Sequence, residues 1–131
     1  MRLQCAMLFV KDFARMKEFY GRMLGADPIN HAADRAPGES WAAFETGGVR
    51  FALHAIPAEL ASAIEISSPP AAREMNPVKL IFAVDDVAAE RARLEALGVT
   101  MLPRAWQDPE GSCDGLDPEG NVFQIARMDS F

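Results

Sequence analysis

Residues 3–25 read LQCAMLFVKDFARMKEFYGRMLG, and residues 79–98 read KLIFAVDDVAAERARLEALG. Each stretch begins with a short apolar run typical of a buried strand. Asp12 and Asp86 then stand where a helix N-cap is expected, and the glycine that closes each stretch stands where the helix should end. Asp86 lies 74 residues after Asp12, and the two glycines lie 73 residues apart. The sequence therefore predicts an internal repeat of a strand followed by a helix.

Three further strand-like runs follow each predicted helix, with turn-rich segments between them. Two of the turns read Asp-Pro-Glu-Gly, in which proline fixes φ and glycine accepts the exit geometry of a type I turn. The runs are residues 29–33, 41–45 and 50–55 in the first half, and 99–106, 112–116 and 122–127 in the second. We therefore predict an α+β chain whose single domain, residues 1–131, has a βαβββ module at 1–56, a linker at 57–77 and a second βαβββ module at 78–131.

Composition limits the classes of partner. The chain has 131 residues, 50% of them hydrophobic and 24% charged, as in one ordinary globular domain. Its net charge of −6 repels phosphate backbones and anionic membrane surfaces, so we expect no nucleic-acid partner and no membrane partner. Because no leader or long apolar run is present, we expect a cytoplasmic protein with Cys5 and Cys113 reduced.

Several short motifs together carry a resemblance. They are Val-Lys-Asp-Phe at 10–13, Phe-Tyr at 19–20, Leu-Gly at 24–25, Val-Asp-Asp-Val at 84–87 and Asp-Pro-Glu-Gly-Asn at 117–121. The chain resembles the vicinal oxygen chelate superfamily, which includes glyoxalases, bleomycin-resistance proteins, extradiol dioxygenases and fosfomycin-resistance enzymes. The resemblance implies a cupped mixed β-sheet with helices on its convex face. It also implies that two chains pair, so we expect a homodimer.

The resemblance also implies where a divalent metal would be held. Metal-using members offer one inward His, Glu or Gln from each of four strands, and the matching positions here are Cys5, Ala52, Lys79 and Gln124. An alanine offers no donor atom, and a protonated lysine adds positive charge to a cationic site. We therefore expect no metal cofactor. A rearranged metal site around His54, Gln124 and Glu45 is the alternative.

Strand alternation predicts which side chains share a face. One face should carry four sets of side chains, and the resemblance implies that this face is the inside of the cup: Cys5, Met7 and Phe9; Arg50, Ala52 and His54; Lys79, Ile81 and Ala83; and Val122, Gln124 and Ala126. Apolar walls with a few polar groups are typical of small-molecule pockets. The candidate ligand-binding residues are Cys5, Met7, Trp41, Arg50, His54, Lys79, Trp106, Asp114 and Gln124.

Aromatic and histidine side chains have two interpretations each. His54 could coordinate an ion or act as a general base, or it could be hydrogen-bonded at a strand end. Trp41 and Trp106 could stack on a flat ligand at the rim of a pocket. They could instead pack in the core or in a dimer interface.

The charged candidates also have two interpretations. Lys79 and Arg50 could anchor an anionic group, or their side chains could reach past the strand ends into water. Asp114 and Glu45 could contact a ligand at the mouth of a pocket, or they could be solvated turn carboxylates.

Three functions remain open. The first is a protein that binds a small organic molecule in its cup without a metal, like the bleomycin-resistance branch. The second is a metal-dependent lyase, dioxygenase or thiol transferase, which predicts a stoichiometric divalent ion. The third is a non-catalytic accessory subunit, which predicts a filled cup with Met7 or Phe9 at its centre.

Overall fold

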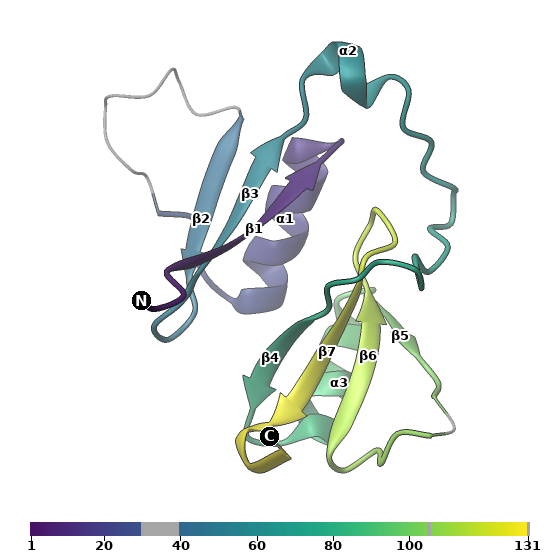
Figure 1. Cartoon of the computed structure of the whole chain (residues 1–131). Helices are drawn as coiled ribbons and strands as arrows, with labels where there is room; N and C mark the ends of the chain where they lie inside the picture. The colour runs from purple at the N-terminus through teal and green to yellow at the C-terminus, as the bar shows by residue number, and fades with distance from the viewer. Residues whose placement is uncertain (30–39, 105, 131) are drawn as a thin grey trace. The chain divides into compact units, whose positions relative to one another are not determined.

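The computed structural model describes residues 1–29, 40–104 and 106–130. They form two compact units, Met1–Glu65 and Ile66–Phe131. Each unit contains a small mixed sheet and one long helix (Figure 1). The predicted mixed α+β fold is confirmed, and each unit is described below by itself.

The first unit contains β1 (Cys5–Val10), α1 (Phe13–Leu24), β2 (Trp41–Glu45), β3 (Arg50–Ala55) and the short α2 (Ala58–Ala61). Its three strands lie in the order β1-β3-β2, with β1 parallel and β2 antiparallel to β3. The Asp12 carboxylate accepts a hydrogen bond from the backbone N–H of Arg15, and so caps α1. At the other end, Gly25 takes a left-handed φ of 61°, which only glycine adopts without steric cost.

The second unit repeats this plan. It contains β4 (Leu80–Val84), α3 (Val87–Ala96), β5 (Thr100–Leu102), β6 (Ser112–Leu116), β7 (Val122–Arg127) and a closing 3-10 turn, η1 (Met128–Ser130). The strand order is β4-β7-β6-β5, with β4 parallel to β7 and the other neighbours antiparallel. Asp86 caps α3 by accepting from the N–H of Ala89 at 2.9 Å. Both predicted N-caps are confirmed.

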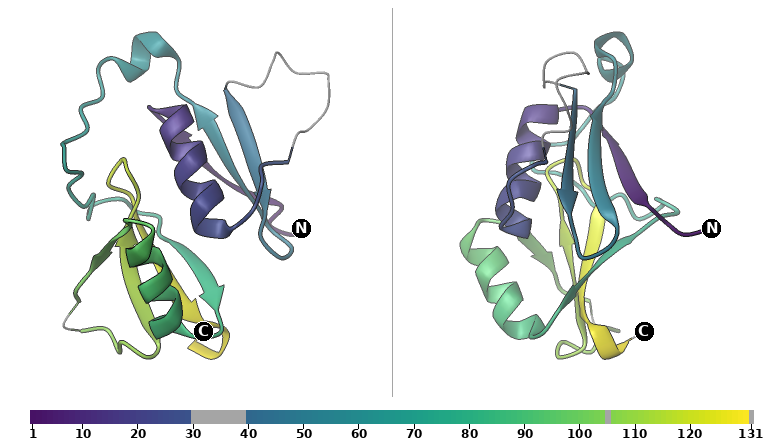
Figure 2. Two further views of the ribbon diagram at one scale, coloured as in Figure 1. Left: turned by 180° about the vertical axis from the view of Figure 1, so that it is seen from behind. Right: turned by 90° about the vertical axis from the view of Figure 1, so that its left-hand side faces the viewer.

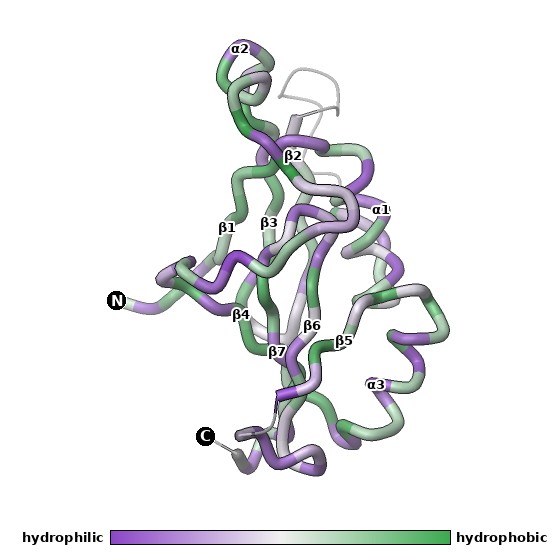
Figure 3. Tube along the Cα trace, turned by 90° about the vertical axis from the view of Figure 1, so that its right-hand side faces the viewer, coloured by the Kyte–Doolittle hydropathy of each residue, from purple (hydrophilic) through white to green (hydrophobic). Residues whose placement is uncertain are grey.

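In each unit the helix covers one face of the sheet (Figure 2). Along α1, hydrophilic and hydrophobic residues alternate, whereas β1 is apolar throughout (Figure 3). Tyr20 of α1 packs on Phe51 of β3 with ring centroids 4.6 Å apart, and Phe82 packs on Phe123 at 6.2 Å under α3. This arrangement leaves the other face of each sheet for side chains that the core does not use.

The predicted strands at 41–45, 50–55, 112–116 and 122–127 match β2, β3, β6 and β7. The predicted strand at 99–106 is wrong in length, because β5 ends at Leu102. Pro103 follows, and proline has no N–H to donate to a strand ladder. Of the predicted strand at 29–33, Ile29 forms an isolated bridge with Ala43, and the rest lies outside the described residues.

The Asp-Pro-Glu-Gly-Asn motif at 117–121 forms a turn closed by its first side chain. Asp117 accepts from the backbone N–H groups of Glu119 and Asn121, both at 2.9 Å, and from the Asn121 amide at 2.8 Å. The carbonyl of Gly120 then accepts from the N–H of Arg73. This bond ties the motif to the segment around Arg73.

Within residues 1–29, 40–104 and 106–130, no helix has the length and apolar character that a membrane span requires.

Candidate functional site

Asp114 lies at the centre of β6, on the sheet face opposite α3. It is paired across the ladder with Gln124 of β7, which is paired in turn with Ile81 of β4. Directly opposed residues point to the same face, so these three side chains share it. The strand alternation predicted for Ile81 and Gln124 is confirmed within this unit.

Three side chains donate hydrogen bonds to the Asp114 carboxylate. Lys79 Nζ lies 2.9 Å from Oδ2, Gln107 Nε2 lies 2.8 Å from Oδ1, and Arg104 Nε lies 3.4 Å from Oδ2. The Asp114 side chain has no exposed surface. The alternative that Asp114 is a solvated turn carboxylate is therefore wrong, because the residue lies within a strand and its charge is enclosed by donors. We call Lys79, Arg104, Trp106, Gln107 and Asp114 the Asp114 cluster.

Two cations pair with the buried carboxylate of the Asp114 cluster. A buried carboxylate is stable only when it is paired and hydrogen-bonded, and two cations provide this for Asp114. Arg104 also binds Glu74 at 2.6 Å. The hydrogen bond that Arg104 donates to Glu74, together with the negative charges of Glu74 and Asp114, raises the pKa of the Arg104 guanidinium above its ordinary value. Arg104 therefore stays cationic.

Trp106 forms the exposed part of the cluster. The Lys79 ammonium lies over its ring, 5.7 Å from the centroid, in a cation–π contact. The Trp106 residue is 70% exposed, so packing in the core of this chain is excluded. Sequence analysis missed Arg104, which fell inside the strand predicted at 99–106, and Gln107, which fell between that strand and the turn at 108–111.

The matching face of the first unit carries a row of three rings. In the register, His54 of β3 is flanked by Phe9 of β1 and by Trp41 of β2, and the Phe9 and His54 centroids are 5.5 Å apart. Among the described residues, His54 Nδ1 is buried and has no hydrogen-bond partner. Among the described residues, Nδ1 therefore does not make the hydrogen bond that one interpretation of His54 expects. Phe9 is 65% exposed and Met7 is also exposed, so neither side chain fills a closed centre.

The rest of that face separates into an apolar row and a charged row. Met7, Ala52 and Ala43 form the next row across the three strands, and Cys5, Arg50 and Glu45 form the one after it. Arg50 Nε binds the Glu45 carboxylate at 2.8 Å. Arg50, expected to anchor an anionic group or to reach into water, is thus paired with its cross-strand neighbour Glu45.

The residues present do not fit a divalent metal. Ala52 is fully buried without a donor atom, and the Lys79 amine is occupied by Asp114. Within the described parts of the chain, no three His, Cys, Asp or Glu side chains group closely enough to hold an ion. The alternative site of His54, Gln124 and Glu45 is not favoured, because Glu45 lies opposite Arg50, four residues and about 13 Å along β3 from His54.

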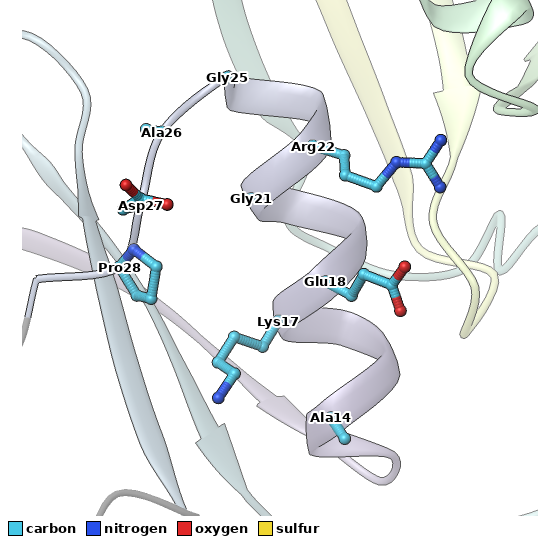
Figure 4. A pocket seen from close by; sticks show the side chains of 9 residues that line it. All are labelled: Ala14, Lys17, Glu18, Gly21, Arg22, Gly25, Ala26, Asp27 and Pro28. Carbon is cyan, nitrogen blue, oxygen red and sulfur yellow. The ribbon is translucent and has the colours of Figure 1, made fainter.

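A separate hollow of about 430 Å³ lies beside α1 (Figure 4). It is lined by residues from Ala14 to Arg22 on the helix and by the segment 25–28 that follows it. Lys17, Glu18, Arg22 and Asp27 bring both signs of charge to it. This mixture favours no ligand charge, and we assign no role to the hollow.

Comparison with known proteins identifies the family. A family model described as a glyoxalase-like domain matches residues 5–126. The chain belongs to this glyoxalase-like family. A search of curated proteins found no match. The resemblance to the vicinal oxygen chelate superfamily is confirmed by this match and by the solved structures that share the fold.

Three solved structures are similar to this chain in fold. A glyoxalase/bleomycin resistance protein/dioxygenase family enzyme from Burkholderia phytofirmans is 25% identical, with 97% of this chain and 98% of that chain covered and a TM-score of 0.69. Lactoylglutathione lyase from Agrobacterium tumefaciens is 18% identical, with 97% and 93% covered and a TM-score of 0.66. The fosfomycin resistance protein FosX from Listeria monocytogenes, solved with Mn(II), is 18% identical, with 99% and 95% covered and a TM-score of 0.66. At 18% identity, the last two likenesses concern the fold alone.

The glyoxalase-like chain thus groups its candidate residues by unit. In the second unit, Lys79, Trp106 and Asp114 meet in one cluster, with Gln124 beside Asp114 in the sheet. In the first unit, Trp41 and His54 lie side by side, while Cys5 and Arg50 lie in a different row. A ligand role for each of these residues stays a prediction.

Proposed function

We propose that this glyoxalase-like protein binds a small organic molecule without holding a metal ion. The observation that carries the proposal is the Lys79–Asp114 pair, 2.9 Å apart with Asp114 fully buried. Where the resemblance expects a metal ligand, the chain has a cation already held by its counter-ion. A second cation beside a metal would be repelled, whereas an organic molecule needs only shape, stacking and a few polar contacts.

The chemistry of the two faces favours binding over catalysis. A general base must reach the proton that it removes, within hydrogen-bond distance. Asp114 is enclosed by three donors, and His54 Nδ1 is buried. The Asp114 cluster and the His54 row therefore offer groups that can hold and orient a ligand, rather than an accessible base.

A thermal-shift screen tests this function. A ligand that binds only the folded state raises the melting temperature by mass action. We expect aromatic members of a small-molecule panel, which includes cationic, neutral and anionic compounds, to raise it in the presence of a chelator. We expect Zn²⁺, Mn²⁺, Ni²⁺ and Fe²⁺ alone to leave it unchanged. A rise with a divalent ion alone, lost in His54→Ala, would instead support a metal-dependent lyase, dioxygenase or thiol transferase.

The screen also separates the third function. If neither ions nor small molecules raise the melting temperature, the chain acts as an accessory or interaction subunit, and the proposal is wrong. Binding without chemical change is then checked by recovering each hit unaltered after long incubation. A converted molecule would contradict the assignment of a binding protein.

We also propose that two chains pair. In the described part of the first sheet, β1 is an edge strand, and its Met7 and Phe9 side chains are exposed. Exposed apolar side chains on a strand edge favour association with another surface. Light scattering coupled to gel filtration should give the mass of two chains, and Phe9→Lys should reduce it toward one. A single-chain mass for the unaltered protein would contradict pairing.

A further inference from the structure

We infer that the Asp114 cluster recognises a planar aromatic carboxylate, with Lys79 binding the acid group and Trp106 stacking on the ring. The inference rests on the proposed function and specifies its ligand. Its starting point is that the residues at the expected metal-ligand positions do not fit a metal ion. The positive charge that a metal would supply to an anionic ligand is supplied here by a side chain.

The Lys79 ammonium is both fixed and available. It has three N–H donors, and among the described residues Asp114 is the one hydrogen-bond acceptor that it contacts. Its side chain is 36% exposed, so a ligand can approach it from solvent. Its bond to Asp114 and its position over Trp106 hold it in one place. A fixed cation loses little side-chain entropy on binding, which favours recognition of a small anion.

The sign of the charge presented to a ligand is positive. Asp114 has no exposed surface, so its carboxylate faces its own donors rather than solvent. The exposed Glu74 carboxylate balances the charge of Arg104, so the charge that lies beside the Trp106 ring is that of Lys79. A cationic ligand stacked on Trp106 would lie beside the Lys79 ammonium and be repelled by it. Because the whole chain carries −6, the attraction is local and does not come from the average field.

Trp106 supplies the contact that selects a ring. The ion pair between Lys79 and Asp114 does not need an exposed indole for its stability. Trp106 is nevertheless 70% exposed beside it. A flat ligand can cover this ring in an offset stack. With the ammonium 5.7 Å from the ring centroid, a carboxylate attached directly to a stacked ring would reach Lys79. The cluster thus matches a compact aromatic acid better than a long-chain acid.

Isothermal titration with three matched probes tests the inference. Indole-3-carboxylate, indole-3-carboxamide and tryptamine present an anion, a neutral polar group and a cation on the same ring. We expect the carboxylate to bind about tenfold or more tighter than the carboxamide, as one charge-assisted hydrogen bond allows. Tryptamine should bind most weakly. Equal affinities for carboxylate and carboxamide, or no binding of the carboxylate, would overturn the inference.

Variants assign the effect to the two side chains. Lys79→Met should remove the preference for the carboxylate, and Lys79→Arg should keep most of it. Because Lys79→Met leaves Asp114 short of a donor, Lys79→Met combined with Asp114→Asn removes both charges and should keep the fold while losing the preference. Trp106→Ala should weaken all three probes, and Trp106→Phe should recover part of the affinity. An unchanged preference in the folded double variant would overturn the inference.

Arg127→Met is the matched control. Arg127 is another exposed cation of the same sheet, bound to Asp129 at 2.6 Å, and it lies outside the Asp114 cluster. Arg127→Met should leave the affinities for all three probes unchanged. A loss of affinity equal to that in Lys79→Met would show that any exposed cation of the sheet produces the effect, and would overturn the inference. If tryptamine or another molecule of the thermal-shift panel binds but the carboxylate does not, the proposed function stands and this inference falls. A response to a divalent ion alone contradicts the proposed function itself.

Discussion

The two described sheets pair their equivalent strands in the same order, with β5 added in the second, but they differ at their centres. In the first unit the central cross-strand pair is Ala43 and Ala52, and in the second the equivalent pair is Asp114 and Gln124. Both alanines are fully buried, and the carboxylate of the second pair is the centre of a hydrogen-bonded cluster. The repeat therefore maintains strand pairing and capping while the chemistry of its open face changes. Function has to be assigned unit by unit.

The rows of residues beside these central pairs differ in the size of their side chains, and here the larger side chains lie in the first unit. Beside the two alanines stands the aromatic row, in which His54 lies between Phe9 and Trp41. Beside Asp114 and Gln124, the equivalent row consists of Ser112, Ala126 and Ala83, all small. The first sheet has alanines in its central pair and large rings in the flanking row. The second sheet has polar side chains in its central pair and only small side chains in the flanking row. This difference predicts unequal responses to matched substitutions.

The largest difference is expected at the two paired carboxylates. Asp114→Ala removes the acceptor of three donors and should lower the free energy of unfolding by about 2–4 kcal/mol. The value falls below that for a fully enclosed pair, because Lys79 and Arg104 can each reach water. Glu45→Ala breaks an exposed pair with Arg50 and should cost less than about 1 kcal/mol. Urea unfolding measures both, and equal losses would contradict the distinction.

A second difference lies on the helix-facing side of the sheets. Phe44 of β2 stacks on Phe51, whereas the equivalent residue of β6 is Gly115, paired with Phe123. A Cβ at Gly115 would lie 2.5 Å from the Phe123 ring and 2.9 Å from the sulfur of Met101. Gly115→Ala should therefore cost about 1–3 kcal/mol through overpacking.

The matched control for this prediction is Gly21 in α1. A Cβ there would meet the carbonyl oxygen of Ala26 at 3.5 Å, an ordinary contact distance. Gly21→Ala should stabilise the protein by about 0.5–1 kcal/mol, because alanine is the better helix former. Thermal unfolding of both variants gives the comparison. A stabilising Gly115→Ala would show that Phe123 is free to move.

The third prediction concerns the unpaired nitrogen of the aromatic row. His54→Phe removes the buried Nδ1, which has no partner among the described residues, and retains a ring beside Phe9. The free energy of unfolding should change by less than about 1 kcal/mol, since no hydrogen bond is lost. Chemical denaturation tests this prediction. A loss greater than about 2 kcal/mol would show that Nδ1 is hydrogen-bonded in solution.

The last prediction concerns the two thiols. We expect it to involve the smallest effect on stability and the clearest difference in chemical reactivity. Burial raises the pKa of Cys113, more than nearby Arg91 lowers it, so at pH 8 this thiol remains mostly protonated. Because the thiolate is the reactive form, Cys113 should react with a disulfide reagent only after unfolding. The half-exposed Cys5 should react in the native state. Two fast thiols in the native protein would contradict the burial of Cys113.

The fold could be predicted from local signals, and the site only in part. N-cap aspartates, apolar runs and strand alternation act within a few residues, which is why α1, β2, β3, β6 and β7 were placed correctly. The Asp114 cluster depends instead on how the chain turns after Pro103, which brings Arg104 and Gln107 to a strand that follows later. No local sequence pattern predicts these contacts with Asp114. Likewise, the pairing of Lys79 with Asp114 spans 35 residues.

Metal analysis of the purified protein tests the central claim most directly, that a side-chain cation stands where a metal would be needed. The protein is dialysed against Zn²⁺, Mn²⁺, Ni²⁺ or Fe²⁺, freed of excess ion, and measured by plasma mass spectrometry. We predict that no ion is retained in proportion to the chain, and that indole-3-carboxylate binds equally well with and without a chelator. One divalent ion retained per chain, with carboxylate binding abolished by the chelator, would contradict the account.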